Sequence, residues 1–494
     1  MSILAVTGVA GRQIEVPTGL FIHNAFIPAT NSLTVENPTT GETLGKISAA
    51  GPEDVDKAVS SAILGYEMWR DTAASTRSKL LFRLAELIER DAEELASLEA
   101  VDAGLLYNDS MQMSIPQSAA TLRYYAGWTD KIDGKTLEMD GGVAFTYREP
   151  LGVCAAIVPW NTPLMITIWK LAPALAAGNV LIIKPSEMSP LYAQKLATLI
   201  REAQFPAGVV NIIPGDGTSA GRALSEHMLV RKITFTGSTA TGRQILKAAA
   251  ATNLKRVSLE LGGKGPSIVF EDCDLENALL WTRIGITTHN GQICAAGSRI
   301  YVQKSIYDEF LRRYKDIAAN SPVVFGDPLD PNTTKGPIVS RTQHEKVLAY
   351  IEQGRQCGSR LLFGGERVGK KGYFVQDTAF VDVPEDATIL REEIFGPVAC
   401  IVPFNTEDDA IRMANDSIYG LSAAVFSNDV NRTHRVTRAL DAGHVTVNAW
   451  AMLSSNVPFG GVKESGFGRD MGEDALESWT SVKAVKYAIA PAKL

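Results

Sequence analysis

The segment from residue 151 to residue 262 constrains the fold most strongly, because five short apolar runs alternate in it with stretches of helix length. Short runs rich in β-branched side chains are typical of buried strands, and their alternation with helices predicts a parallel, doubly wound α/β sheet. The expected strands are residues 153–158, 180–183, 209–213, 233–236 and 257–259.

Each expected strand is followed by a turn that contains polar residues, glycine or proline. These turns are Pro159-Trp160-Asn161, Lys184-Pro185-Ser186-Glu187, Pro214-Gly215-Asp216-Gly217, Gly237-Ser238-Thr239 and Glu260-Leu261-Gly262-Gly263. Ligands of open parallel sheets bind at the carboxyl ends of the strands, so we expect the five turns to converge on one crevice.

The remaining segments predict further layers around this sheet. Residues 20–130 carry a turn signal at residues 37–41 and then amphipathic stretches such as residues 77–91, which predict a helical layer. Residues 263–462 alternate again, with expected strands at residues 300–302 and 444–447, and predict a second α/β domain. A length of 494 residues allows two to four domains, and no internal repeat or long linker separates them.

Composition and charge argue against several classes of function. The net charge of −7, without a basic stripe, disfavours nucleic-acid binding. Five cysteines without CxxC spacing and six histidines without HExxH spacing disfavour a disulfide framework and a metal site. No run approaches the roughly twenty apolar residues of a membrane span, and residues 1–11 lack the basic leader of a secretory signal. We expect a cytoplasmic protein, although the tail Ala492-Lys493-Leu494 approximates the peroxisomal signal Ser-Lys-Leu and leaves that compartment open.

A candidate dinucleotide cradle lies where one strand passes into a helix. Gly237, Ser238 and Gly242 are placed there so that free backbone N–H groups and the helix dipole can receive a pyrophosphate, although such a turn can also be purely structural. One strand away, Glu187 is a candidate acceptor for ribose hydroxyls and Lys184 a candidate donor. The alternative is a solvated pair at a helix start. A carboxylate at this place repels a 2′-phosphate, which favours NAD over NADP without excluding NADP.

Two further side chains are candidates for chemistry. Cys294 lies among small residues, where a substrate can approach a thiol closely; the alternative is a buried, inert cysteine. Glu260 ends an apolar strand, where burial raises the pKa of a carboxyl toward that of a general base; the alternative is a structural ion pair.

Taken together, the motifs resemble the aldehyde dehydrogenase superfamily in order and spacing from about residue 20 to the C-terminus. The closest likeness is to hydrolytic, NAD(P)-dependent members, and a fungal member is one candidate. The motifs that carry the resemblance are Pro159-Trp160-Asn161, Lys184-Pro185-Ser186-Glu187, Phe235-Thr236-Gly237-Ser238, Glu260-Leu261-Gly262-Gly263-Lys264, Gly291-Gln292-Ile293-Cys294, Glu392-Glu393-Ile394-Phe395-Gly396-Pro397-Val398 and Pro458-Phe459-Gly460-Gly461.

The resemblance implies a catalytic role for five residues. Cys294 is expected to attack the aldehyde, and the side-chain amide of Asn161, with the backbone N–H of Cys294, to hold the oxyanion. After hydride has passed to the nicotinamide, water activated by Glu260 is expected to hydrolyse the thioester. Lys170 and Glu473 match positions that the family uses as a proton path from that base.

The resemblance also implies how the cofactor is held and how the chain is organised. Glu393 is expected to bind the nicotinamide ribose with Phe395 beside it, Trp160 and Ser238 to contact the pyrophosphate, and Leu261 to complete the cofactor site. The expected architecture is a Rossmann-like parallel-sheet cofactor domain, a second α/β catalytic domain and a small β oligomerisation element. These correspond to residues 1–130 with 151–262, residues 263–462, and residues 131–150 with 478–494. Strands of the third element pair across subunits in the family, which leaves homodimer and homotetramer open.

Departures from the family pattern concern the substrate pocket. His289 stands where the family usually has Asn, and Thr288 where an aromatic residue is frequent. The resemblance places Thr162, Met165, Trp169, Thr288, Leu453 and Phe459 along the pocket. Few of these are aromatic, which favours a wider channel and a bulkier aliphatic or aromatic aldehyde. His289 could titrate beside the nucleophile, but a loop histidine with a structural role is the simpler interpretation.

Two other functions stay open. In the acylating class coenzyme A takes the acyl group instead of water; such relatives commonly lack the carboxylate found here as Glu260, which favours hydrolysis. A non-catalytic protein on the same fold is the other alternative, and the joint presence of Cys294, Glu260 and Asn161 argues against it.

Overall fold

The largest sheet of the protein has eight strands. The structure is a computed structural model that describes residues 2–489. The strand order of this sheet is β25-β13-β12-β9-β10-β11-β3-β4. The five central strands are parallel, which confirms the predicted sheet, and the three nearest its middle consist wholly of buried residues. These strands are β9 (Val153–Ile157), β10 (Val180–Lys184), β11 (Val210–Ile212), β12 (Lys232–Thr236) and β13 (Arg256–Glu260), and the antiparallel β25 (Gly466–Phe467) extends one edge.

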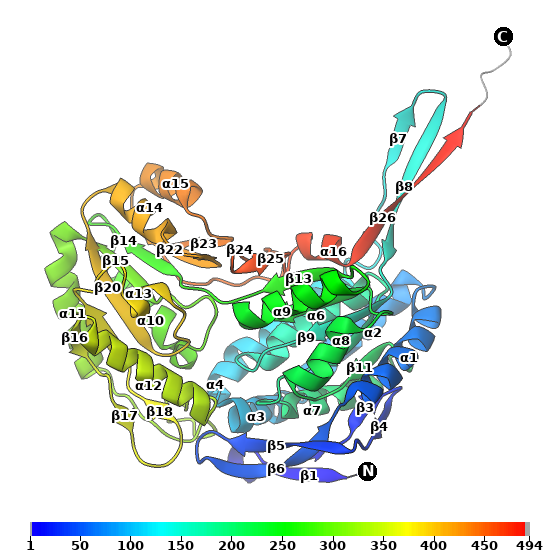
Figure 1. Ribbon diagram of the computed structural model, residues 1–494, viewed down its shortest axis with the longest axis horizontal. Coiled ribbons are helices and arrows are strands. Elements are labelled where there is room, and N and C mark those ends of the chain that lie inside the picture. Colours follow the sequence, from blue (N-terminus) through cyan, green and yellow to red (C-terminus); the bar gives the residue numbers. More distant parts are fainter. Residues whose placement is uncertain (1, 490–494) are drawn as a thin grey trace.

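Strands that follow β9 in the chain are added to the sheet on both of its sides. β10 lies on one side of β9 and β12 on the other, so β9 marks the point where the strand order reverses. In such sheets ligands bind beyond the carboxyl end of the strands at this point. The helices that follow the strands and cover the sheet are α6 (Pro163–Ala176), α7 (Leu191–Glu202), α8 (Arg222–Glu226) and α9 (Thr239–Ala251), with α8 and α9 side by side (Figure 1).

The N-terminal region corrects the expected helical layer over residues 20–130. Within this range helices begin only at residue 52, with α1 (Pro52–Trp69), α2 (Ala74–Arg90), α3 (Ala92–Ala103), α4 (Tyr107–Asp109), the π-helix η2 (Ser110–Ser114) and α5 (Ile115–Ala126). Strands precede them: β1 (Ile3–Thr7), β2 (Gln13–Pro17), β3 (Leu20–Ile22), β4 (Ala25–Ile27), β5 (Asn31–Asn37) and β6 (Glu42–Ala49). His23 and Asn24 both have positive φ and make the two-residue turn between β3 and β4, a hairpin signal that the helical prediction missed.

A second sheet carries the other half of the chain. Its order is β16-β19-β20-β15-β14-β22-β23, with only β16 antiparallel to its neighbour. The strands are β14 (Pro266–Val269), β15 (Arg299–Gln303), β16 (Arg360–Phe363), β19 (Thr378–Val381), β20 (Val398–Phe404), β22 (Ser422–Phe426) and β23 (His444–Val447), so the strands predicted at residues 300–302 and 444–447 are confirmed. Around this sheet lie α10 (Leu275–Thr287), α11 (Tyr307–Asn320), α12 (Arg341–Gln356), α13 (Thr388–Arg391), α14 (Glu407–Asn415) and α15 (Val430–Ala439) (Figure 1).

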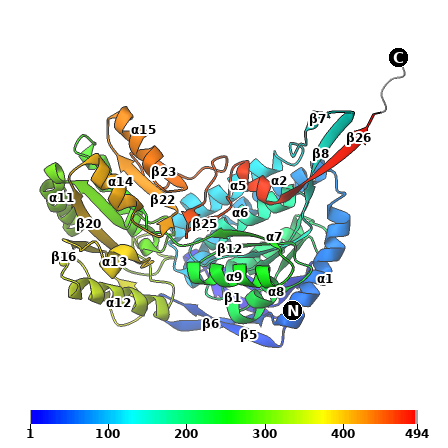
Figure 2. The same cartoon turned by 45° about the horizontal axis from the view of Figure 1, so that its top comes forward.

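A narrow three-stranded sheet projects from the body in both views (Figures 1 and 2). It consists of β7 (Thr136–Met139), β8 (Gly142–Pro150) and β26 (Thr480–Ala488), in the order β26-β8-β7. The two segments that the sequence marked as strands therefore pair with each other within one chain. Large apolar side chains stay exposed on this sheet, namely Leu137, Met139, Tyr147, Val482 and Tyr487. The tripeptide Ala492-Lys493-Leu494 lies outside the described residues.

Among residues 2–489, no helix combines the length and the apolar character needed to cross a bilayer.

Candidate active site

Cys294 is presented by an unusual turn of the backbone. His289, Asn290 and Gly291 have φ values of +45°, +55° and +66°, so three successive residues adopt the left-handed conformation just before the cysteine. Such conformations cost energy in non-glycine residues and are often found at functional sites. The loop packs so tightly that a Cβ on Gly263 would lie 2.2 Å from the carbonyl oxygen of Cys294. The turn thus fixes the thiol at a defined place.

The Cys294 thiol is partly exposed and holds its proton strongly. Burial, followed by the charges of Glu260 and Glu393, raises its pKa to about 12, against the lowering effect of the backbone N–H groups of Ala295 and Cys294. Glu260 lies close enough to this thiol for its charge to act on it. A base must therefore act before the thiol can become a nucleophile.

Glu260 is the candidate for this base. The side chain ends β13, is 6% exposed, and its Oε1 has no hydrogen-bond partner among residues 2–489. Burial, with the charge of Asp470 adding to it, raises its pKa well above the ordinary value, although Lys170 and Arg469 act in the opposite direction. Gly460 leaves the room for this carboxyl, because a Cβ there would lie 2.6 Å from Oε1.

Asn161 lies between the end of β9 and the start of α6. The side chain is 4% exposed, and its Nδ2 donates to the backbone carbonyl of Gln292 at 2.9 Å, two residues before Cys294. Gln292 is itself held, because its Oε1 accepts from the backbone N–H of Val339 at 3.0 Å. The amide predicted to hold an oxyanion is therefore fixed beside the cysteine.

Of the two residues expected to form a proton path, only Lys170 is paired with another buried charge among the residues that the structure describes. Lys170 is buried and forms an ion pair with Asp470, which is also buried. Glu473 is exposed at the start of α16 (Asp474–Ser478) and takes no part in this pair. Asp470 is brought to the pocket because its backbone pairs with that of Phe459 through two hydrogen bonds of 2.7 and 2.8 Å.

An apolar cluster surrounds Cys294 and contains most of the predicted substrate residues. Trp169 and Phe459 pack with their ring centres 5.5 Å apart. The other predicted members are Met165 and Leu453, and sequence reasoning missed Met113, Ile293 and Met471. Thr162 is buried as the residue that precedes α6.

Thr288 does not join the apolar cluster. It lines a separate cavity of about 340 Å³ together with His289, Asp109 and Lys335. Burial lowers the pKa of His289 to about 4, so this histidine stays neutral at physiological pH and the interpretation of a titrating histidine is not supported. His289 Nε2 has no partner among the described residues.

The residues predicted to hold a ribose and the pyrophosphate of a dinucleotide lie on both sides of β9. Lys184, at the end of β10, is buried, and its Nζ lies 3.3 Å from Oε2 of the half-exposed Glu187. Across β9, Ser238 caps α9 by accepting from the backbone N–H of Thr241, and the first turn of this helix is accessible. Gly242 packs on Leu261, where a Cβ would lie 2.7 Å from Cδ2.

Phe395, predicted to lie at the nicotinamide, packs on Trp160, which is predicted to contact the pyrophosphate. The rings of Trp160 and Phe395 meet edge to face with centres 5.3 Å apart. Glu393 Oε1 accepts from the backbone N–H of Gly263 at 2.9 Å, and burial raises the pKa of Glu393 to about 7. An open helix N-terminus can receive a pyrophosphate, and the Lys184–Glu187 pair and the Glu393 carboxyl can bind ribose hydroxyls. The chemistry of these groups therefore fits a dinucleotide.

Comparison with known proteins gives matches along nearly the whole chain. A model of the Aldehyde dehydrogenase family matches residues 26–485. Aldehyde dehydrogenase 1A1 of Ovis aries is 47% identical over 479 residues, which cover 96% of this chain and 95% of the relative. The aldehyde dehydrogenase of Emericella nidulans, a fungal relative, is 46% identical and the match covers 97% of each chain.

Solved structures of aldehyde dehydrogenases also match this chain closely. The NAD+ complex of an aldehyde dehydrogenase from Bacillus cereus superposes with a TM-score of 0.94 at 42% identity, over 96% of this chain and 97% of that one. An indole-3-acetaldehyde dehydrogenase with NAD+ gives 0.94 at 39% identity, over 96% and 97% of the two chains. These matches confirm the resemblance and the fold class predicted from the motifs. The chain belongs to the aldehyde dehydrogenase family and is an NAD(P)-dependent enzyme that oxidises aldehydes.

Proposed function

We propose that this enzyme converts an aldehyde to a carboxylic acid through a thioester on Cys294 that water, activated by Glu260, then hydrolyses. The observation that carries the proposal is the closeness of these two side chains: Phe459 packs in the apolar cluster around Cys294, and the next residue, Gly460, lies against the Glu260 carboxyl. The charge of Glu260 accordingly raises the pKa of the Cys294 thiol. Asn161 supports it, because its amide is fixed beside the same loop.

The chain's own residues account for the steps around carbon–sulfur bond formation. Once deprotonated, the Cys294 sulfur adds to the aldehyde carbon, and Asn161 Nδ2 with the backbone N–H of Cys294 stabilises the oxyanion. Bound NAD supplies the hydride acceptor that makes this an oxidation. Water then attacks the thioester, the carbon–sulfur bond breaks, and the water proton passes to Glu260. From there the buried Lys170–Asp470 pair offers it a path.

We also propose a bulkier aliphatic or aromatic aldehyde as the substrate. The cluster around Cys294 contains three methionines, Met113, Met165 and Met471, whose flexible side chains adapt to large apolar groups. The indole-3-acetaldehyde dehydrogenase among the solved relatives is named for an aromatic aldehyde. A panel from acetaldehyde to phenylacetaldehyde tests this: kcat/KM should rise with size, and a clear preference for acetaldehyde would contradict it.

The parts of the chain take the roles expected from the family. Residues 1–130 with 151–262 bind the dinucleotide, residues 263–462 carry the cysteine, and residues 131–150 with 478–494 join copies of the chain. The exposed apolar side chains of the projecting sheet support the last role. Sedimentation of the parent should give a dimer or tetramer, and Val482→Glu combined with Tyr487→Glu should reduce it; a monomeric parent would contradict the assignment.

The mechanism is tested by product analysis with three proteins. The parent should form acid and NADH without coenzyme A, and Cys294→Ala should form neither while binding NAD normally. For the third protein, Glu260→Gln, the measurement is the modification of Cys294 by iodoacetamide as a function of pH. Modification should begin at a lower pH than in the parent, because the neighbouring negative charge has been removed and the pKa of the thiol falls. A product that appears only as the acyl ester of coenzyme A would overturn the hydrolytic proposal.

A further inference from the structure

Two buried carboxyl groups of the cofactor half lie outside the mechanism described so far. Glu99 and Asp102 are one turn apart on α3 and are 0% and 1% exposed. Neither forms an ion pair with any residue from 2 to 489. Burying a carboxyl costs several kcal/mol unless hydrogen bonds replace its lost water, so the contacts of these two groups indicate what they do.

Glu99 holds the start of α6. Its Oε1 accepts from the backbone N–H of Leu164 at 3.0 Å and from Ser114 Oγ at 3.2 Å, and its Oε2 accepts from Ser110 Oγ. Leu164 follows Asn161 by three residues. The two serines begin and end the π-helix η2, which carries Met113 into the cluster around Cys294. One carboxyl thus links the oxyanion amide to a wall of the substrate pocket.

Asp102 holds the start of α7 in the same way. Its Oδ2 accepts from the backbone N–H of Leu191 at 2.9 Å, and Leu191 is the first residue of that helix. The segment just before α7 contains Lys184 and Glu187, the pair assigned to the cofactor ribose. The other oxygen, Oδ1, has no partner in the described part of the chain.

Both helices lack a capping side chain of their own. Thr162 before α6 and Pro190 before α7 make no side-chain hydrogen bond to the first turn. The first N–H groups of a helix need acceptors, and an acidic group there also complements the helix dipole. α3 therefore supplies from one face the caps that two functional loops lack.

We propose that Glu99 and Asp102 are positioning residues with separate targets: Glu99 sets the place of Asn161 and Met113, and Asp102 sets the place of the Lys184–Glu187 pair. This inference rests on the proposed function for the roles of Asn161 and of the ribose pair. It predicts that two carboxyl groups one turn apart influence different kinetic constants.

Side chains of similar size allow the acceptor oxygens to be kept or removed while the buried space stays filled. Glu99→Gln and Asp102→Asn each keep one oxygen for the backbone N–H, whereas Glu99→Met and Asp102→Leu fill similar space and keep none. Burial raises the pKa of both carboxyl groups, so an amide resembles the protonated form of either.

The kinetic experiment compares these four variants with the parent. Glu99→Met should lower kcat about tenfold or more through misplacement of the amide, with the Kd for NAD, measured by tryptophan fluorescence, within twofold of the parent. Asp102→Leu should raise that Kd about tenfold and leave kcat at saturating NAD within twofold. Glu99→Gln and Asp102→Asn should recover most of each loss. Parallel losses in both constants, or amides as damaging as the apolar variants, would overturn the proposal.

Hydrogen exchange gives a second measurement that needs no activity and uses the milder amide variants. Glu99→Gln should speed deuterium uptake in the peptide around Leu164 and not around Leu191, and Asp102→Asn should do the reverse. Equal uptake at both helix starts would overturn the proposal even if an apolar variant fails to fold. A parent that forms no NADH with any aldehyde would instead refute the proposed function, and the exchange result would still decide the positioning.

Discussion

The side-chain amide of Asn161 donates to the backbone carbonyl of Gln292 at 2.9 Å, which connects the end of the first parallel strand to the loop that carries Cys294. Asn161 follows a strand of the first sheet, and Gln292 precedes a strand of the second. Their contact places an N–H donor beside the nucleophile before any substrate arrives, and such preorganised donors are where much of enzyme catalysis comes from.

Removing this donor should cost activity more than binding. We expect Asn161→Ala to lower kcat by about 10²–10³-fold, the usual effect of losing one oxyanion donor. Stopped-flow measurement of NADH formation checks this. The rate at which iodoacetamide modifies Cys294 is the control, because it should change little while the loop stays in place. An unchanged kcat would show that Asn161 does not hold the oxyanion.

The charge of Asp470 should set the pH at which Glu260 acts. Asp470 raises the pKa of Glu260, so Asp470→Asn should lower that pKa and move the rise of thioester hydrolysis with pH to more acidic values. Glu473→Gln is the matched control, because Glu473 is exposed and its loss should leave the profile unchanged. A profile that moves only in Glu473→Gln would restore the proton path expected from the sequence.

Glu187 should exclude NADP by charge repulsion. We expect Glu187→Ser to raise kcat/KM for NADP by roughly tenfold and to lower it for NAD, because a ribose acceptor and a negative charge are lost together. Glu187→Asp keeps the charge and should keep the preference for NAD. Parallel initial-rate assays with both cofactors measure this, and an unaltered ratio in Glu187→Ser would contradict it.

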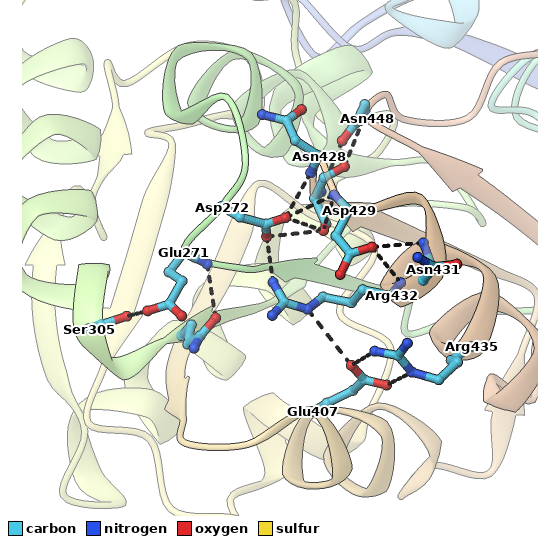
Figure 3. Close-up of polar contacts among 12 residues, drawn as sticks. Glu271, Asp272, Ser305, Glu407, Asn428, Asp429, Asn431, Arg432, Arg435 and Asn448 are labelled. Carbon is cyan, nitrogen blue, oxygen red and sulfur yellow. Dashed lines mark hydrogen bonds and ion pairs between the residues drawn. The ribbon is translucent and has the colours of Figure 1, made fainter.

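Asp272 should stabilise the second sheet in a pH-dependent way. It accepts from Ser427 Oγ at 2.8 Å, from the backbone N–H of Asp429 at 2.9 Å and from Arg432 at 2.6 Å, which joins α15 to the end of β14 (Figure 3). Burial alone would raise its pKa, but the Ser427 hydrogen bond and the Arg432 charge outweigh burial and lower it. Because the folded pKa lies below the unfolded one, this stabilisation is complete well above pH 3.8 and is lost as the pH falls through the folded value.

Urea unfolding should therefore detect Asp272→Asn at neutral pH. We expect a loss of about 1–3 kcal/mol at pH 7, the cost of weakening a partly buried hydrogen-bonded charge, and a smaller loss at pH 3.5. Asp316→Asn, which removes an exposed carboxyl paired with Arg312, is the control and should cost less than about 1 kcal/mol. An equal loss at both pH values would rule out the charge as the cause.

Local sequence patterns predicted the central sheet well and the outer layers less well. Strands such as residues 153–157 are apolar throughout because both faces are covered, so their signal is strong. The hairpin turn at His23-Asn24 lacks glycine, and its strands are only three residues long, so residues 20–27 carry a weak strand signal.

Site residues that stand in a recognisable sequence motif were predictable. Residues that reach the site only through the packing of distant segments were not. Cys294, Glu260 and Asn161 stand in specific motifs. Asp470 and Glu473 are three residues apart in one segment, and only the pairing of Asp470 with the backbone of Phe459 shows which of them reaches Lys170. Glu99 stands in a helix far from any motif, and its contact with Leu164 depends on how α3 packs.

The most direct test of the mechanism is trapping the thioester in Glu260→Gln. Mixed with aldehyde and NAD, this variant should release one equivalent of NADH per active site and then stop, because Cys294 still reacts but water is no longer activated. Mass spectrometry should find the acyl group on the peptide that contains Cys294. Continued turnover at the parent rate, or an acyl group on any other residue, would contradict the account.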